Sequence, residues 1–130
     1  MLGALNPLKT VNTAAKLGGA IFKGSKLARN MTNAGRGVVK GKDEAHHIVA
    51  QTDKRAAGSR EILQRNGIDV HGADNGAAMV KAEHRGVHTT EYHQNVEQRL
   101  TAAESRGSCA ASCQAEVRQE LKQIGKELEK

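Results

Sequence analysis

The sequence predicts a small α+β domain that is mainly helical. The chain has 130 residues, about the size of one domain. Apolar residues recur at helical spacing over residues 85–104 and 117–128, whereas residues 45–50 form one short apolar stretch typical of a strand or extended segment. One Phe, one Tyr and no Trp leave the core to aliphatic side chains. We therefore expect modest intrinsic stability, increased by a bound metal ion or a partner.

The first 42 residues form a basic arm. Residues 1–42 contain eight Lys or Arg and no Asp or Glu, which leaves residues 43–130 with a net charge of −2. Leu17, Ile21 and Phe22 could form one weak amphipathic helix, but Gly, Ala, Asn and Thr make most of the arm linker-like. Such an arm attracts polyanions, of which nucleic acid is the most common and an anionic membrane surface the second.

Membrane insertion is not expected. No stretch approaches the roughly 18 apolar residues of a membrane span, and the apolar residues around Leu17 are too few and too Gly-broken for a signal peptide. Cys109 and Cys113 are too few for a disulfide scaffold and lie inside a predicted helix. They leave the redox compartment open.

Residues 43–106 are expected to form the core unit. After the extended segment at residues 45–50, residues 60–66 predict a short helix that stops at Gly67. Asp74, Asn75 and Gly76 favour a tight turn with positive φ, in a loop or at the edge of a hairpin. A helix over residues 85–104 would then end near Gly107.

Residues 107–130 are expected to form a C-terminal amphipathic helix. Val117, Leu121, Ile124 and Leu128 follow one another at spacings of four, three and four, which gives one continuous apolar stripe. This helix should dock on the core or on a partner.

Histidines gather in the middle of the chain. His46 and His47 are adjacent, His84 and His88 are four residues apart, and His93 follows. On a helix, two residues four apart share one face, so His84 and His88 could bind one metal ion, with room for water and phosphate. The alternative is a solvated helix face. Adjacent residues of an extended segment point to opposite sides, so His46 and His47 can have different roles.

Three parts of the sequence together resemble a known superfamily. They are Glu-Ala-His-His-Ile-Val at residues 44–49, Asn75-Gly76, and His-Arg-Gly-Val-His at residues 84–88. This series resembles the HNH superfamily of ββα-metal (His-Me finger) nucleases, and Ala-His-His resembles its AHH branch, found as toxin domains of bacterial polymorphic toxins. The resemblance covers residues 43–100 and implies a ββα-metal core with endonuclease activity.

The resemblance also implies roles for the histidines. His47 would be the general base that takes a proton from the attacking water, a task that suits an imidazole with an ordinary pKa near 6.5. His46, His84 and His88 would hold a divalent ion against the scissile phosphate. That ion, Mg²⁺, Mn²⁺, Ni²⁺ or Zn²⁺, would stabilise the developing charge and the leaving 3′-oxygen.

The remaining motif positions have more open roles. The resemblance assigns Asn75 to the catalytic set, as a brace for the loop between the two strands or as a ligand. Glu44 would orient a ligand His or an Arg, or is a solvated charge. The interval from His47 to Asn75 is 28 residues, so we expect the two strands to be separated by an insertion, and we interpret His71, inside it, as a loop residue.

Three further residues are candidates for nucleic-acid contacts. Arg85 and Lys81 could bind phosphate, although a solvated charge is the alternative for both. His93 lies about 140° from His88 around an ideal helix, so we expect it to contact phosphate or to pack, rather than to bind the metal.

Two other functions remain possible. The same imidazoles could close a structural zinc site in a DNA-binding module without catalysis, but such a site needs a fourth ligand. His93 has poor geometry for it, and the cysteines lie 21 or more residues past His88. An interaction or membrane-active module could explain the basic arm and the C-terminal helix, but not the histidines.

The expected substrate is DNA, with RNA as the alternative. With few aromatic residues to stack on bases, contacts to the backbone of duplex DNA are favoured. The resemblance to toxin domains further implies a secreted or delivered effector that acts in the cytoplasm of a target cell. A cell that makes such a protein needs an immunity protein as a partner, and we expect that partner to be acidic.

Overall fold

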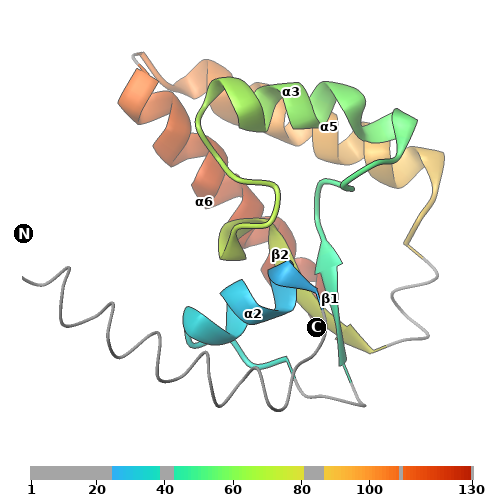
Figure 1. Ribbon diagram of the computed structural model, residues 1–130. Helices are drawn as coiled ribbons and strands as arrows, with labels where there is room; N and C mark the ends of the chain where they lie inside the picture. Colours follow the sequence, from blue (N-terminus) through green and yellow to red (C-terminus); the bar gives the residue numbers. More distant parts are fainter. Residues whose placement is uncertain (1–24, 39–42, 81–86, 109, 130) are drawn as a thin grey trace, which may run out of the picture.

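The computed structural model describes residues 25–38, 43–80, 87–108 and 110–129. Its elements are α2 (Lys26–Asn33), β1 (Asp43–His47), the 3-10 helix η2 (Lys54–Ala56), α3 (Ala57–Arg65), the 3-10 helix η3 (Ala73–Asn75), β2 (Gly76–Val80), α5 (Thr90–Arg106) and α6 (Ala110–Leu128). Strands β1 and β2 pair antiparallel. The described part is mainly helical with one small sheet, which confirms the predicted fold class (Figure 1).

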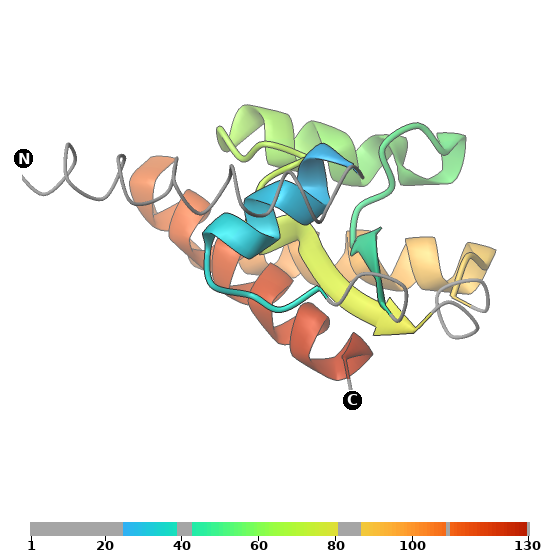
Figure 2. The same cartoon turned by 60° about the horizontal axis from the view of Figure 1, so that its bottom comes forward.

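Helices cover both faces of the two-stranded sheet (Figures 1 and 2). Because successive strand residues point to opposite faces, Ala45 of β1 and Ala78 of β2 pack against the cluster of Leu27, Met31 and Val38 beside α2. On the other face, Ala77 and Met79 join the main apolar core, which includes Leu100 of α5 and Leu121 of α6. The sheet is therefore sandwiched between α2 and the α5–α6 pair.

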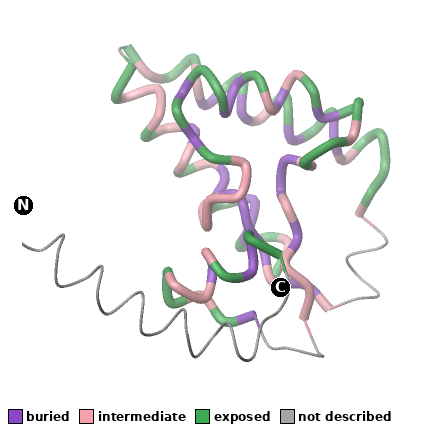
Figure 3. Tube along the Cα trace, viewed as in Figure 1, coloured by how far each residue is buried: buried purple, intermediate pink, exposed green. Residues whose placement is uncertain are grey.

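Helix α6 packs its apolar stripe against the core. Val117, Leu121 and Ile124 are all buried, and exposed positions alternate with buried ones along α5 and α6 (Figure 3). Arg99 of α5 donates to Glu120 and Glu127 of α6, with nitrogen–oxygen distances of 2.7 Å to each. The predicted amphipathic helix thus docks on the core of its own chain. Among the described residues, no helix is both long enough and apolar enough to cross a membrane.

The structure extends the folded unit into the predicted basic arm. Helix α2 begins at the N-cap Ser25, whose hydroxyl accepts a hydrogen bond from the backbone N–H of Ala28. Leu27 and Met31 are fully buried. The linker-like interpretation is therefore wrong for this helix. Packing against the sheet stabilises helical structure in a segment whose composition is typical of a linker. The weak helix expected near Leu17 lies outside the described residues.

The connection between the strands contains the expected insertion. It comprises η2, α3 and η3, and α3 is stopped at Gly67, which has a φ of +67°. The predicted positive φ near residue 75 is not found, because residues 73–75 form η3 and Gly76 is extended, with a φ of −115°. Gly76 is instead required by close packing, since a Cβ atom there would lie 2.5 Å from the sulfur of Met31.

The helix that follows the sheet starts later than predicted. Helix α5 begins at Thr90 rather than near residue 85, because Thr89 is its N-cap and accepts a hydrogen bond from the backbone N–H of Tyr92. His88 therefore precedes the helix, so the prediction that His84 and His88 share one helical face is wrong. His84 itself lies outside the described residues.

Leu27→Ala tests whether α2 belongs to the folded unit. We expect a loss of about 2–5 kcal/mol in the free energy of unfolding, the usual cost of truncating a buried leucine, measured by urea denaturation. Its control is Lys26→Ala, at the exposed neighbouring position, which should change stability by less than about 0.5 kcal/mol. Equal stability of the two variants would mean that α2 is an appendage.

Candidate functional site

The two adjacent histidines of β1 lie in different surroundings. His46 is 1% exposed, and its Nε2 atom lies 2.9 Å from the hydroxyl oxygen of Tyr92 in α5. His47 is half-buried, and its Nε2 atom lies 3.1 Å from Nδ1 of His71, in the loop between α3 and η3. The strand therefore presents one imidazole to α5 and the next to the insertion, in agreement with the alternation of an extended chain.

Tyr92 fixes the tautomer of His46. Its hydroxyl donates to the backbone carbonyl of Ile48 at 2.7 Å, and burial raises the pKa of the Tyr92 phenol above its ordinary value. The phenol thus keeps its proton and donates it to the Ile48 carbonyl. Toward His46 the hydroxyl oxygen can therefore only accept a hydrogen bond, from the Nε2–H group. The neutral His46 ring then carries its lone pair on Nδ1, the atom that could bind a metal ion.

His88 lies beside His46. The two ring centroids are 5.5 Å apart, with an angle of 62° between the ring planes. Two imidazoles on one tetrahedral ion, with metal–nitrogen bonds of about 2.0–2.1 Å, have centroids roughly 5 Å apart. The spacing of His46 and His88 is close to this value, and His88 is exposed to solvent.

The described residues contain only part of the predicted site. No group of three or more His, Cys, Asp or Glu that could hold a metal ion occurs in the segments that the structure describes. The third predicted ligand, His84, and the predicted phosphate contacts Lys81 and Arg85 lie outside those segments. Of the three predicted ligands, the structure describes His46 and His88, and their role as ligands stays a prediction.

Asn75 is a buried brace. Its side chain is fully buried, its Oδ1 atom accepts from the backbone N–H of Val49 at 2.8 Å, and its Nδ2 atom donates to the carbonyls of Val49 at 3.1 Å and Val70 at 2.8 Å. The amide thereby joins the chain after β1 to the loop before η3. Of the two roles considered for Asn75, these contacts correspond to the brace rather than to a ligand.

Glu44 lies in β1, half-buried, opposite Met79 in the register of the sheet. It is two residues from His46, so both side chains project from the same face of the strand. This position is consistent with a carboxylate that supports the His46 side of the site.

His93 does not face the solvent. It is 2% exposed, and its Nε2 atom lies 3.5 Å from a carboxylate oxygen of Asp53. Burial lowers the pKa of His93, although the Asp53 charge opposes this shift, while hydrogen bonds from Arg55 hold the pKa of Asp53 far below its ordinary value. Of the two expectations for His93, a phosphate contact or packing, burial of the ring corresponds to packing and not to the phosphate contact, because His93 lies between α5 and the turn before η2.

Two residues of the site were not found from the sequence. From the sequence, His71 is interpreted as a loop residue, and Tyr92 is not singled out. Tyr92 is the single tyrosine of the chain, four residues after His88, which is a usable signal. The sequence offered a weaker signal for His71: the chain has six histidines, and the other five were all assigned to candidate roles in the site.

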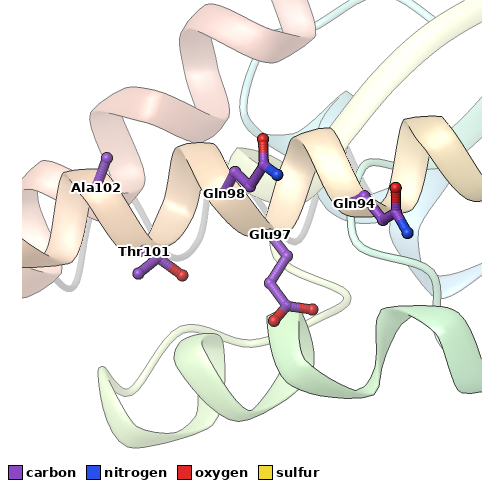
Figure 4. Close-up of a pocket in the computed structure, with 5 residues that line it drawn as sticks. All are labelled: Gln94, Glu97, Gln98, Thr101 and Ala102. Atoms are coloured by element: carbon purple, nitrogen blue, oxygen red, sulfur yellow. The ribbon is translucent and has the colours of Figure 1, made fainter.

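One surface hollow lies apart from these histidines. Its lining residues all belong to α5: Gln94, Glu97, Gln98, Thr101 and Ala102 (Figure 4). Neither Asn75 nor any of the histidines described above lines this hollow. The histidines gather instead around β1.

Asn75→Ala tests the brace. Loss of its three hydrogen bonds leaves the two buried backbone groups of Val49 unsatisfied, at about 1–3 kcal/mol each, so we expect the free energy of unfolding in urea to fall by about 2 kcal/mol or more. Asn33→Ala is the matched control, because the Oδ1 atom of Asn33 accepts no hydrogen bond. An Asn75→Ala protein as stable as wild type would contradict the brace.

A known protein family matches most of the chain. The model of the family AHH, described as a nuclease family of the HNH/ENDO VII superfamily with a conserved AHH, matches residues 27–128. The match begins in α2 and ends with α6, beyond the expected residues 43–100. No curated protein and no solved structure matches the chain significantly. Since the family model covers most of the chain, including Ala45-His46-His47 at the centre of the site, the chain belongs to the AHH nuclease family of the HNH/ENDO VII superfamily.

Proposed function

We propose that this nuclease is a metal-dependent endonuclease that hydrolyses phosphodiester bonds of DNA. The observation that supports it best is the separation of the two adjacent histidines: His46 lies beside His88, and His47 lies on the opposite side of the strand, beside His71. One strand thus offers a metal ligand and a base at neighbouring positions.

His47 is the general base of the proposed reaction. Its ring is half-buried, and a neutral imidazole nitrogen can accept a proton from water. It takes a proton from water as the water oxygen attacks phosphorus, and the bond from phosphorus to the 3′-oxygen breaks. The leaving oxygen receives its proton from solvent.

His46, His88 and, from the sequence, His84 would hold the divalent ion. When bound, the ion supplies charge stabilisation at the phosphate and at the leaving oxygen. The protein's own contribution is orientation: Tyr92 holds the His46 ring by Nε2–H, and Asn75 holds the chain that follows β1. These contacts keep the histidines in place without rearrangement during the reaction.

The substrate is inferred from charge and composition. Eight basic residues and no acidic ones in residues 1–42 favour contacts with a phosphate backbone, and a chain with one Phe, one Tyr and no Trp has few surfaces for stacking bases. Both features favour duplex DNA with little sequence preference. Lys81 and Arg85 remain proposed phosphate contacts.

The biological setting that we propose is a delivered toxin. An unspecific nuclease damages the genome of the cell that makes it, so delivery into the cytoplasm of another cell and a cognate immunity protein would be required. An acidic immunity protein that covers the histidines or the basic arm is the expected form, because it would compete with DNA for the same charges. The support is the resemblance to toxin domains and this requirement for protection.

Cleavage of supercoiled plasmid tests the proposed activity. We expect wild type to nick and linearise DNA only when Mg²⁺, Mn²⁺, Ni²⁺ or Zn²⁺ is restored after chelation. His47→Ala should lower the rate by about 10²–10⁴-fold, the usual contribution of a general base, while metal binding measured by calorimetry stays unchanged. Gln98→Ala, on the exposed face of α5, is the control and should cleave like wild type.

Two results would oppose this function. Metal binding without cleavage of DNA or RNA would favour a structural-metal DNA-binding module. Equal cleavage by wild type and His47→Ala would remove His47 as the base.

Tyr92→Phe tests how His46 is held. It deletes the acceptor for His46 Nε2–H while keeping the ring, and loss of such a supporting contact typically lowers metal affinity about 10–100-fold. The readout is calorimetric titration with Zn²⁺ or Ni²⁺. His93→Gln is a useful comparison, since His93 is buried next to Tyr92 but is not placed at the ion. Unchanged affinity in Tyr92→Phe would mean that the hydroxyl does not position the ligand.

A further inference from the structure

His71 lies against the proposed base. Its Nδ1 atom is 3.1 Å from Nε2 of His47, and the two rings meet edge to face, with centroids 5.2 Å apart and planes at 71°. The contact joins β1 to the loop before η3 across 24 residues of sequence. Neither the motif resemblance nor the family match assigns a role to this residue.

The backbone of His71 is anchored independently of its ring. Its N–H donates to the side chain of Asp69 at 2.8 Å, and its carbonyl accepts from Nδ2 of Asn30 in α2 at 2.7 Å. The preceding carbonyl, of Val70, accepts from the buried amide of Asn75. The loop thus presents the imidazole from a fixed position, and substitution of the ring leaves these backbone contacts in place.

The contact allows only complementary tautomers. When both rings are neutral, one proton lies between His47 Nε2 and His71 Nδ1, so one nitrogen donates and the other accepts. If His71 donated, His47 would carry its own proton on Nδ1 and would have no lone pair left for water. If His71 accepts, His47 keeps its proton on Nε2, and its lone pair lies on Nδ1, the nitrogen that would take the proton from water.

We propose that His71 is a positioning residue that accepts the Nε2–H of His47 and so holds the base in its reactive tautomer and orientation. This inference rests on the proposed function, in which His47 is the base. During the reaction the water proton moves to His47 Nδ1, while the proton on Nε2 stays on His47. The hydrogen bond to His71 Nδ1 then stabilises the imidazolium that has formed. His71 therefore acts through His47 and touches neither water nor phosphate.

Three substitutions of His71 separate positioning from packing. In His71→Asn, the side-chain oxygen is one bond from Cγ, as Nδ1 is in histidine, so the acceptor is kept. In His71→Gln the polar atoms lie one bond further out, where Nε2 was, and His71→Ala has no acceptor. We expect His71→Ala and His71→Gln to lower kcat for plasmid cleavage about 10–100-fold, the usual loss on removal of a supporting contact, and His71→Asn to restore most of it.

Other readouts identify a merely structural effect. KM for DNA, the affinity for Zn²⁺ and the midpoint of thermal unfolding should stay near wild-type values in all three variants. If His71 only packs the loop, stability would fall in His71→Ala, and His71→Asn would show no selective rescue of kcat. Either of these results would overturn the proposal.

A double mutant distinguishes this inference from the proposed function. If His71 acts only through His47, then adding His71→Ala to His47→Ala causes no further loss, because the effects of coupled residues do not add. Additive losses would show that His71 acts elsewhere. A His47→Ala protein that cleaves like wild type would contradict the proposed base itself, whereas an inactive His47→Ala with a fully active His71→Ala would contradict only the role of His71.

Discussion

The buried carboxamide of Asn75 is the contact on which the site depends. It satisfies the N–H and the carbonyl of Val49 just after β1, both buried, and the half-buried carbonyl of Val70 in the insertion, so these three backbone groups have partners. A carboxylate at this position could not donate, and a hydroxyl could not span the same groups. A carboxamide is therefore suited to link the chain after β1 to the end of the insertion.

Asn75 joins the chain after β1 to the end of the insertion, and this junction holds β1 in place. Side chains on both faces of β1 can then reach their partners. Beyond His47 the ladder continues through the hydrogen bond from Ile48 N–H to the carbonyl of Asn75, at 2.8 Å. From this fixed strand, His46 reaches Tyr92 and His88, and His47 reaches His71. One structural amide thus holds the strand that carries both imidazoles, and alternation along the strand sends these neighbouring side chains in opposite directions. Arg36 reinforces the same junction by donating to the carbonyls of Ala73 and Gly76.

Regular local patterns were sufficient to predict several elements. The stripe through Leu121 predicted α6, and Gly67 marked the end of α3, since both signals depend only on nearby residues. The start of α5 was predicted too early, because the apolar spacing of the helix extends back to Val87, whereas the N-cap at Thr89 sets the boundary. Helix α2 was missed because packing against the sheet, rather than propensity, stabilises it.

The motif residues could be selected from the sequence, but their supporting contacts could not. Spacing indicated His46 and His47, and alternation indicated that they would differ in role. Their partners Tyr92 and His71 are 46 and 24 residues away, so no local period connects them. His93 shows the converse: proximity to the motif suggested a phosphate contact, but its direction on α5 buries it against Asp53.

The proposed roles of His46 as metal ligand and His47 as general base are tested most directly by nitrogen NMR of the ¹⁵N-histidine-labelled protein. Spectra are recorded with and without Zn²⁺, and single substitutions assign the signals. We expect Zn²⁺ to shift Nδ1 of His46 to a metal-bound value while Nε2 keeps its proton, and we expect the Nε2–H of His47 to persist in both states. A metal-induced shift at the nitrogens of His47, with those of His46 unchanged, would contradict the assignment of ligand and base.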